Sequence, residues 1–582
     1  MTTMDLSGVT LGWLTGPIFD KEMRVSSRRR RNYVLRFVYI GLFTFVVAVL
    51  WIDRVAHTMS SGYTAVYQAS RMSSVGIALV ASVIWFQFLT AQIIAVVMLS
   101  TSISDEIYKR TLGTLMTTPI GSFQIVIGKL ASKLLQIVLL LAISLPLLAI
   151  VRVFGGVPWG FLLSGLCVTL TAVIFVSSLS LLFSIFTRRA YAAILQTILA
   201  MGFLFGFVPG ILAALLHRTV SETTFMSVLS YVNPFVTMAA AMESLLSARP
   251  TVRVLWPLHC AIMLGFSALL LLLAMVFVRK AALRQAVGAT PRGDPETPGP
   301  ARGPAPVSIR RVQGPPVLWK ERRIPLLGKQ RKGAKIVAAL VGLGLLLLTY
   351  GLCERERALD VPEVHMMYTI VFFSLGLLFT MVLPATCITT ERESQTWTLL
   401  LATPVGDWEI LWGKLAGAVR RCLPAWLFLF GHVVVFALAG TIHPMALVQL
   451  GVLVAWVLLF LVSTGLYFSL RCKHTTTAVI ANMGLAAAVW APVPLFLAIL
   501  LAMAKTRSDL IETYMDMNPF VQAVVIMLAT ARKGGLGAYD WMQSGMKSLP
   551  SATGWIVLTF TVYVSVGLIV LAHTAARLRR NP

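Results

Sequence analysis

Charged residues are scarce in this chain. Only 12% of its 582 residues are Asp, Glu, Lys or Arg, whereas soluble domains carry about 25%. Hydrophobic residues make up 57%, and they are gathered in blocks of about 18 residues or more, the length needed to cross a bilayer core. The composition therefore excludes an ordinary soluble protein and predicts an all-α polytopic membrane protein.

Cysteine and histidine motifs are also lacking. The six cysteines form no Cys-x-x-Cys pair, so we predict neither a metal site nor a disulfide framework. The eight histidines include no His-Glu-x-x-His arrangement. The N-terminus has no basic, then apolar, then small-residue cleavage pattern before Arg28, so we expect no removable signal peptide.

Ionisable residues are nearly absent from the interiors of the apolar blocks. The polar residues there are neutral, such as Gln87, Gln136 and Asn482. Ion-coupled carriers normally need a titratable or ion-binding group near the bilayer midplane. The pattern therefore argues against self-powered transport, and energy would have to enter through the loops.

A phosphate-binding loop is missing as well. The segments 121–129 (GSFQIVIGK) and 406–414 (GDWEILWGK) have six residues between their glycines, and Leu follows each Lys. A P-loop needs four residues between its glycines and Ser or Thr after the Lys, so that backbone amides can surround phosphate. We therefore predict that this chain binds no ATP or Mg²⁺ by itself and is not an enzyme.

Positive charge is plentiful, with a formal net charge of +26. Lys and Arg gather in short loops between apolar blocks, as the positive-inside rule requires of cytoplasmic loops. The runs at 28–31 and 329–335 each directly precede an apolar block. Anionic lipid headgroups are therefore the expected partner, and nucleic acid is not.

The chain contains one clear internal repeat. The segment 105–111 (DEIYKRT), followed by TPIG and GKL, returns 285 residues later as 390–396 (TERESQT), followed by TPVG and GKL. The same offset relates Asn233-Pro234-Phe235 to Asn518-Pro519-Phe520. A self-similarity that keeps its register over this distance indicates two copies of one membrane unit.

The apolar blocks predict about twelve transmembrane helices, six in each copy. We predict the spans at 33–52, 75–103, 124–151, 158–186, 190–216, 254–278, 336–352, 366–389, 422–440, 445–470, 475–503 and 554–575.

An even number of spans per copy gives both copies the same orientation, as parallel repeats, and the basic loops place both termini in the cytoplasm. We predict a first unit at 1–284, a Pro/Gly/Arg-rich cytoplasmic linker at 285–315 and a second unit at 316–582. The expected location is the cytoplasmic (inner) membrane.

His432 lies inside a predicted span, where an ionisable group is a functional candidate. Its counterpart in the first copy is Leu147, so the repeat does not support a shared role. We interpret His432 as a hydrogen-bonded packing residue.

The repeated polar segment lies between spans two and three of each copy; we name residues 104–121 the first repeated loop and 389–406 the second. We expect a short helix in each, capped by Ser104 or Thr390 and with acids in its first turn. Both loops retain the order acid, Thr, Leu, Thr-Pro, Gly and Gly-Lys. This pattern favours a surface that binds a partner over a merely solvated loop.

This order of motifs resembles the permease subunits of type-2 ATP-binding-cassette (ABC) exporters. The segments 17–24 (PIFDKEMR) and 316–323 (PVLWKERR) are similar to that family's interfacial helix. The resemblance covers nearly the whole chain twice, which implies two six-span permeases fused in one chain.

The resemblance implies that each repeated loop is a coupling helix seated on a separate ATPase, two ATPase subunits in all, which would bind the ATP and Mg²⁺. It assigns ATPase contacts to Asp105, Glu106, Thr111, Leu115, Thr118, Pro119, Glu391, Glu393, Thr396, Leu400, Thr403 and Pro404. Because Lys109-Arg110 becomes Ser394-Gln395, the two contacts need not be equivalent.

The resemblance also assigns the interfacial helices, with Glu22 and Arg24 matching Glu321 and Arg323. Short helices that dip into the outer leaflet would start at Asn233-Pro234 and Asn518-Pro519, with Asn as the cap. The implied function is export of an unknown substrate. The apolar, charge-poor spans suit a lipid, a lipid-linked glycan or a hydrophobic peptide rather than a bare ion. An ion-coupled secondary transporter and a membrane scaffold of an envelope or motility assembly are the alternatives.

Overall fold

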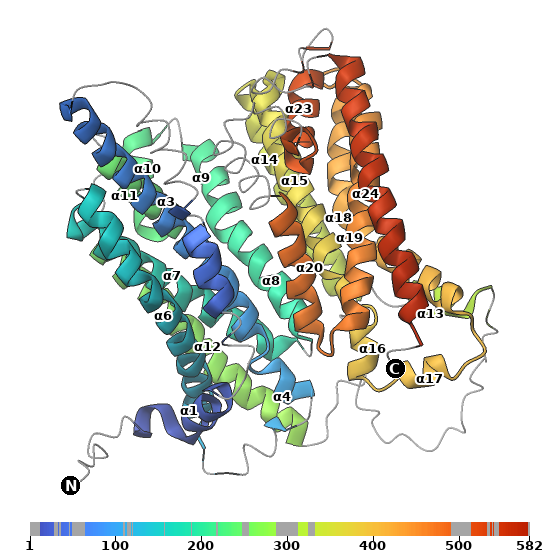
Figure 1. The fold of residues 1–582 in the computed structure, drawn as a ribbon, viewed down its shortest axis with the longest axis horizontal. Helices are drawn as coiled ribbons and strands as arrows, with labels where there is room; N and C mark the ends of the chain where they lie inside the picture. The colour runs from blue at the N-terminus through green and yellow to red at the C-terminus, as the bar shows by residue number, and fades with distance from the viewer. Residues whose placement is uncertain are drawn as a thin grey trace. The chain divides into compact units, whose positions relative to one another are not determined.

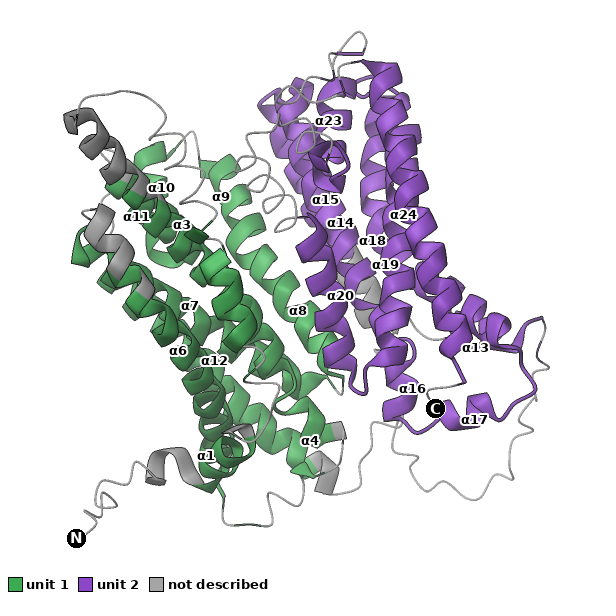
Figure 2. Cartoon of the chain, viewed as in Figure 1, with its two compact units in different colours: residues 1–299 green, residues 300–582 purple. Residues whose placement is uncertain are grey.

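The chain folds into helices throughout the part that the structure describes, and these helices form two compact units, residues 1–299 and 300–582 (Figure 2). The computed structural model describes residues 12–27, 33, 36–45, 47–48, 65–108, 111–112, 118, 120–155, 157–187, 189–216, 219–246, 255–286, 312, 314–323, 332–490, 514–531, 536–537, 539, 546 and 548–579. The predicted linker, 285–315, falls almost entirely outside these ranges.

Unit 1 is a helical bundle (Figure 1). Its helices are α1 (Gly12–Ser27), α3 (Ala65–Ser100), α4 (Ser104–Tyr108), α6 (Ser122–Gly155), α7 (Trp159–Phe186), α8 (Ala190–Gly202), the π-helix η2 (Phe203–Phe207), α9 (Val208–Leu216), α10 (Glu222–Val232), α11 (Pro234–Leu246) and α12 (Trp256–Ala286).

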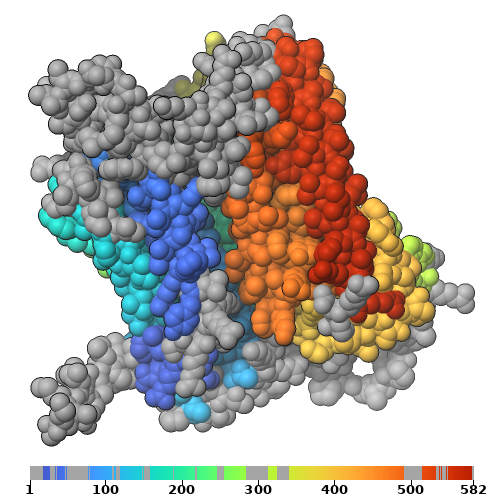
Figure 3. Space-filling view, in the orientation of Figure 1, coloured from blue at the N-terminus to red at the C-terminus, as the bar shows by residue number. Residues whose placement is uncertain are grey.

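Unit 2 is a second bundle. Its helices are α13 (Pro316–Arg323), α14 (Lys332–Arg355), η3 (Ala358–Asp360), α15 (Pro362–Val382), η4 (Pro384–Thr386), α16 (Thr389–Glu393), α17 (Trp397–Leu401), α18 (Asp407–Leu438), α19 (Met445–Arg471), α20 (Thr475–Trp490), α23 (Pro519–Thr530) and α24 (Leu549–Arg577). Helix α24, red in Figure 3, lies on the surface of this unit and exposes apolar side chains such as Ile569.

Nine helices in the described residues are long and apolar enough to cross a membrane, and the number rises to ten if the bent pair α10–α11 counts as one span. The three remaining predicted spans, 33–52, 336–352 and 475–503, coincide with the shorter helix Arg36–Phe45, with α14 and with α20. The sequence-based prediction of an all-α polytopic fold is therefore confirmed.

Each unit buries an apolar cluster at the end that carries its repeated loop. In unit 1, Ile18 of α1 packs in one core cluster with Leu112 of the loop. In unit 2, Val317 of α13 packs with Trp397 of the loop and with Ile410 of α18. The buried residues Leu112 and Trp397 thus fasten the loops to the bundle.

The loops differ from the single capped helix that the sequence predicts. The second loop forms two short helices, α16 and α17, separated at Gln395, whose φ is +58°. Thr390 lies inside α16, which starts without a side-chain cap. Ser104 is the first residue of α4, and its Oγ donates to the carbonyl of Ser100 instead. Both cap predictions are wrong: the Ser104 hydroxyl donates to a carbonyl, and Thr390 lies one residue inside the helix.

His432 is a hydrogen-bonded packing residue, as predicted. Its Nδ1 lies 2.7 Å from the Tyr350 hydroxyl, and its Nε2 lies 3.4 Å from Nδ1 of His365. His365 Nε2 lies 2.9 Å from the Leu359 carbonyl and donates to it. The chain of bonds links α14, α15 and α18 in unit 2.

Candidate functional site

In unit 2, Lys414 joins the interfacial helix α13 to the second repeated loop. Its Nζ lies 2.6 Å from Glu321 Oε1 and 2.5 Å from Glu391 Oε1. The side chains of Lys414 and Glu321 are each 1% exposed. Lys414 Nζ also donates to the carbonyl of Cys387 at 3.4 Å. One ammonium group on α18 therefore bonds to α13, to α16 and to the residue Cys387 just before α16.

Two further cations complete this cluster. Lys320 Nζ lies 2.7 Å from Glu391 Oε1, and Arg421 Nη2 lies 3.7 Å from Glu321 Oε2. Burial alone would raise the pKa of Glu391, but Lys414 and Lys320 outweigh it and hold that pKa below its usual value. A buried carboxylate is tolerated only when it is paired in this way.

Two glycines let α13 approach the backbone of α18. A Cβ atom at Gly413 would lie 2.7 Å from Cγ1 of Val317, and one at Gly417 would lie 2.7 Å from Cβ of Glu321. Any larger residue would push α13 away. The glycines therefore set the distance at which Glu321 reaches Lys414.

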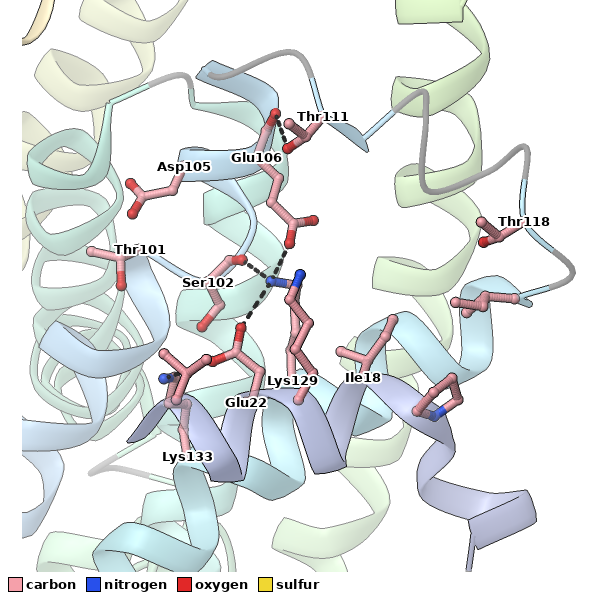
Figure 4. Close-up of a pocket in the computed structure, with 14 residues that line it drawn as sticks. Ile18, Glu22, Thr101, Ser102, Asp105, Glu106, Thr111, Thr118, Lys129 and Lys133 are labelled. Carbon is pink, nitrogen blue, oxygen red and sulfur yellow. Dashed lines mark hydrogen bonds and ion pairs between the residues drawn. The ribbon is translucent and has the colours of Figure 1, made fainter. Parts of the chain in front are cut away.

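Unit 1 contains the same cluster in a looser form (Figure 4). Lys129 Nζ lies 2.7 Å from Glu106 Oε1 and 3.9 Å from Glu22 Oε1, and it donates to the carbonyl of Ser102 at 2.7 Å. Lys133 Nζ donates to Glu22 Oε2 at 3.2 Å. The Glu22 side chain is 27% exposed, against 1% for Glu321. We call each arrangement, Glu22–Lys129–Glu106 and Glu321–Lys414–Glu391, an ion cluster.

A cavity of about 710 Å³ opens beside the first ion cluster, between α1 and the first repeated loop. Figure 4 shows Glu106, Lys129 and Glu22 facing this space. The predicted contact residues Asp105, Glu106, Thr111 and Thr118 also line it.

The two ion clusters do not share one sequence offset. Lys414 and Glu391 follow Lys129 and Glu106 by 285 residues, but Glu321 follows Glu22 by 299 residues. The chain is thus 14 residues shorter between the interfacial helix and the loop of unit 2, as 299 minus 285 gives. Both units nevertheless build the same contact.

In each loop the backbone amide of a repeated threonine donates a hydrogen bond to the backbone carbonyl of the glutamate. The amide of Thr111 donates to the carbonyl of Glu106 at 3.0 Å, and the amide of Thr396 donates to that of Glu391 at 2.9 Å. The glutamate side chains point inward to the lysines, with which they form the ion pairs described above. Sequence reasoning assigned Glu106 and Glu391 to contacts with a partner, whereas the structure places them in ion pairs within the chain.

Other predicted residues form the outer face of the loops. Asp105 and Thr118 are exposed in unit 1, and Thr396 and Pro404 are exposed in unit 2. Leu400 and Thr403 are half-buried, while the adjacent Leu399 is 68% exposed. Leu115 and Pro119 lie outside the described residues.

Glu393 has a structural partner. Although exposed, it accepts a hydrogen bond from the amide of Thr475, the first residue of α20, at 2.8 Å. The second loop is therefore tied to the fifth span of its unit as well as to α13.

The interfacial-helix residues divide into inward and outward groups. Glu22 and Glu321 belong to the ion clusters, whereas Arg24 and Arg323 are exposed. The Arg323 guanidinium lies 3.8 Å from the centre of the Trp319 ring, a cation–π contact on the same helix.

The lysines were missed as site residues. Lys129 and Lys414 occur in the repeated Gly-Lys-Leu motif, which the sequence analysis used as evidence of the repeat without assigning the lysines a role. A lysine kept at the start of an apolar helix in both copies was the available signal. Lys133 and Arg421 carry no such signal, because their counterparts in the other copy, Ala418 and Gln136, are neutral. Lys320 does have a basic counterpart, Lys21, in the other interfacial helix.

Comparison with protein-family models identifies the chain. The model for ABC-2 family transporter proteins matches residues 17–282 and again residues 309–578. Comparisons with curated proteins and with solved structures found no match. The chain belongs to the ABC-2 transporter family, and it contains two copies of the family's permease unit. It is therefore a multi-pass membrane protein and a permease of an ABC transporter.

Proposed function

We propose that this protein is the membrane subunit of an ATP-driven exporter, and that separately encoded ATPase subunits dock at the two repeated loops. In this proposal the protein spans the inner membrane, and both loops and both termini lie on the cytoplasmic side. The ATPases supply ATP and Mg²⁺ binding, and this chain supplies the path for an apolar substrate.

The repeated ion cluster is the observation that carries this proposal. In each unit a lysine at the start of span three joins a glutamate of the interfacial helix to a glutamate of the loop. A force applied to the loop therefore reaches two other elements without a flexible connection. Such a link is what a permease needs if an external motor is to move it.

The outer faces of the loops support docking. Leu399 and Pro404 are exposed on the second loop, next to the polar Thr396. An apolar centre with a polar rim is the usual composition of a protein interface. On the first loop, the cavity beside Glu106 offers room for a side chain of the partner.

The two docking sites are unequal in this proposal. Unit 2 has close pairs, with Lys414 bonded to both glutamates within 2.6 Å, whereas Glu22 lies 3.9 Å from Lys129 beside an open cavity. We expect the second loop to bind its ATPase as a preformed surface and the first loop to close on its ATPase.

The test begins with orientation. Single cysteines replace Leu399 in the second loop and, as the matched control, the exposed Val361 at the opposite end of span eight. A membrane-impermeant maleimide should label Val361→Cys in intact cells and Leu399→Cys only in inside-out vesicles. Labelling of Leu399→Cys from outside the cell contradicts the proposal.

The second part tests the partner. The chain, purified from native membranes in mild detergent, should bring an ATPase with it, and Glu106→Gln combined with Glu391→Gln should reduce ATP-dependent transport. If no ATPase accompanies the chain and transport collapses with the ion gradient instead, the secondary transporter is correct. If neither ATP nor a gradient drives transport, the scaffold is correct.

A further inference from the structure

A second repeated contact lies at the opposite end of each bundle from the loop. In unit 1, α10 and α11 meet at Asn233 with a bend of 116°. Asn233 is buried; its Oδ1 accepts from the amide of Phe235 at 3.0 Å, and its Nδ2 donates to the carbonyl of Phe205 at 2.7 Å. The predicted cap is therefore present, and the same side chain also bonds to the fifth span.

The carbonyl that Asn233 reaches lacks its ordinary helical donor. In an α-helix the carbonyl of Phe205 would accept from the amide of residue 209, but residue 209 is proline, which has no N–H. The span is π-helical at this point, and the amide of Val208 donates to the carbonyl of Phe203. Asn233 therefore donates to a carbonyl whose α-helical donor, the amide at position 209, is removed by the proline.

Unit 2 repeats the two hydrogen bonds of this asparagine in the same register. Asn518 Oδ1 accepts from the amide of Phe520 at 3.0 Å, and its Nδ2 donates to the carbonyl of Trp490 at 2.8 Å. Trp490 follows Phe205 by 285 residues, as Asn518 follows Asn233. The sequence also places Pro494 four residues after Trp490, matching Pro209, although Pro494 lies outside the described residues.

Aromatic rings surround both contacts in matching positions. In unit 1 the ring centroids of Phe88 and Phe235 are 5.2 Å apart, and those of Phe175 and Phe205 are 5.5 Å apart. The corresponding pairs of unit 2 are Phe373–Phe520 at 5.4 Å and Phe460–Trp490 at 6.3 Å. We call this region the distal joint: the Asn, the fifth-span carbonyl and the four rings around them.

The carbonyl two residues before each asparagine is also tied to the sixth span, by different side chains in the two units. In unit 1, His259 of α12 donates from Nδ1 to the carbonyl of Tyr231 at 3.0 Å. In unit 2, Gln522 donates to the matching carbonyl of Asp516 at 2.8 Å and to Thr559 of α24 at 2.9 Å. A histidine in unit 1 and a glutamine in unit 2 therefore hold the same carbonyl position.

One helix connects the distal joint to the docking loop in unit 1. Phe88 belongs to α3, which continues without a break to Ser100, and the first repeated loop starts at Ser104. Helix α3 therefore forms a continuous connection between the start of the loop and the ring of Phe235.

We propose that Asn233 and Asn518 are positioning residues that fasten the helices starting at Pro234 and Pro519 to the fifth span of their unit, so that helix and span move as one body when the exporter opens. The proposal rests on the proposed function only for the event that drives the motion. The fastening itself is a property of the isolated chain and is measured there, so the failure of either proposal is recognised separately.

The first experiment is a double-mutant cycle on the full chain in lipid nanodiscs. Asn233→Ser keeps a side-chain acceptor for the cap but loses the amide donor, and Pro209→Ala restores a backbone N–H. Asn233→Ser should lower Tm by about 2–4 °C, and clearly less in the Pro209→Ala background. Ser221→Ala, which removes the exposed cap of α10, is the control and should lower Tm by the same amount in both backgrounds. Additive effects of Pro209→Ala and Asn233→Ser overturn the proposal.

The second experiment measures motion directly. Nitroxide labels at the exposed positions 212 of α9 and 228 of α10, in a chain without other cysteines, report the distance between the fifth span and the bent helices. The wild-type distribution should be narrow, and Asn233→Ser should broaden it with or without Pro209→Ala, because the restored N–H repairs the span but not the fastening. An unchanged width in Asn233→Ser overturns the proposal.

Discussion

Lys414 and Glu321 form an ion pair at 2.6 Å across 93 residues of sequence, and each side chain is only 1% exposed. The pair between Arg579 and Asp407 is equally short, 2.6 Å, but its side chains are 49% and 34% exposed. Water and salt screen the exposed pair, which limits its contribution to about 0–1 kcal/mol. Breaking a buried pair is costly because the remaining charge cannot be hydrated.

Lys414→Met should strongly destabilise unit 2. The substitution leaves the carboxylates of Glu321 and Glu391 buried and close together, a loss of about 3–5 kcal/mol. Lys129→Met is the matched variant in unit 1 and should cost less, because Glu22 and Glu106 are partly exposed. Thermal unfolding of the two variants in nanodiscs checks this order, and equal losses contradict it.

Lowering the pH should remove the contribution of Glu391 to the stability of the folded protein. Its pKa is held below the usual value of 4.5 in the folded protein, so its stabilisation is fully present above that pH and is lost as pH falls through the lowered pKa. The Tm difference between wild type and Glu391→Gln should be constant near neutral pH and should shrink below about pH 4.5. A difference that widens on acidification contradicts this assignment.

Gly413→Ala should separate α13 from α18. The added Cβ would lie 2.7 Å from Val317 Cγ1 and 3.1 Å from the amide nitrogen of Leu318, and the backbone atom cannot move aside. Overpacking of this kind costs about 1–3 kcal/mol. Gly431→Ala on the same helix meets no atom within 4 Å and should be neutral or gain up to about 1 kcal/mol through helix propensity. Unfolding measurements on both variants test the contrast.

Leu399→Asp should abolish binding of the ATPase without lowering Tm. Leu399 is 68% exposed, so a charge there costs the isolated chain little but would be desolvated in an interface. Val361→Asp, at an exposed site on the opposite side of the bundle, should leave binding unchanged. Recovery of the ATPase with each tagged variant is the measurement, and normal recovery with Leu399→Asp would remove this residue from the docking surface.

Much of the fold follows from the sequence because hydrocarbon imposes simple requirements. A span must be apolar and long enough, and its backbone must be satisfied within the helix. These rules are local, so the repeat and most span positions were predictable. The span predicted at 422–440 is an exception, because its helix α18 already starts at Asp407. Helix ends were less predictable. The cap expected at Ser104 is absent because its hydroxyl donates to the carbonyl of Ser100, and the cap expected at Thr390 is absent because that residue lies inside α16.

The site was only partly predictable. The repeat directed attention to Glu106 and Glu391, but the sequence could not show that these carboxylates face inward. Their direction depends on Lys129 and Lys414, 23 residues further along the chain in each unit, and on interfacial helices whose sequence offset differs.

The sequence by itself determined that this chain is a duplicated, membrane-spanning helical protein of low charge, since composition, length and periodicity suffice for that conclusion. Only the tertiary structure decided which acids are buried with which lysines, and which carbonyl each capping asparagine reaches. Those choices depend on distances of a few ångströms between segments far apart in the chain, such as Asn233 and Phe205. Local patterns contain no information about such distances until packing brings the segments together.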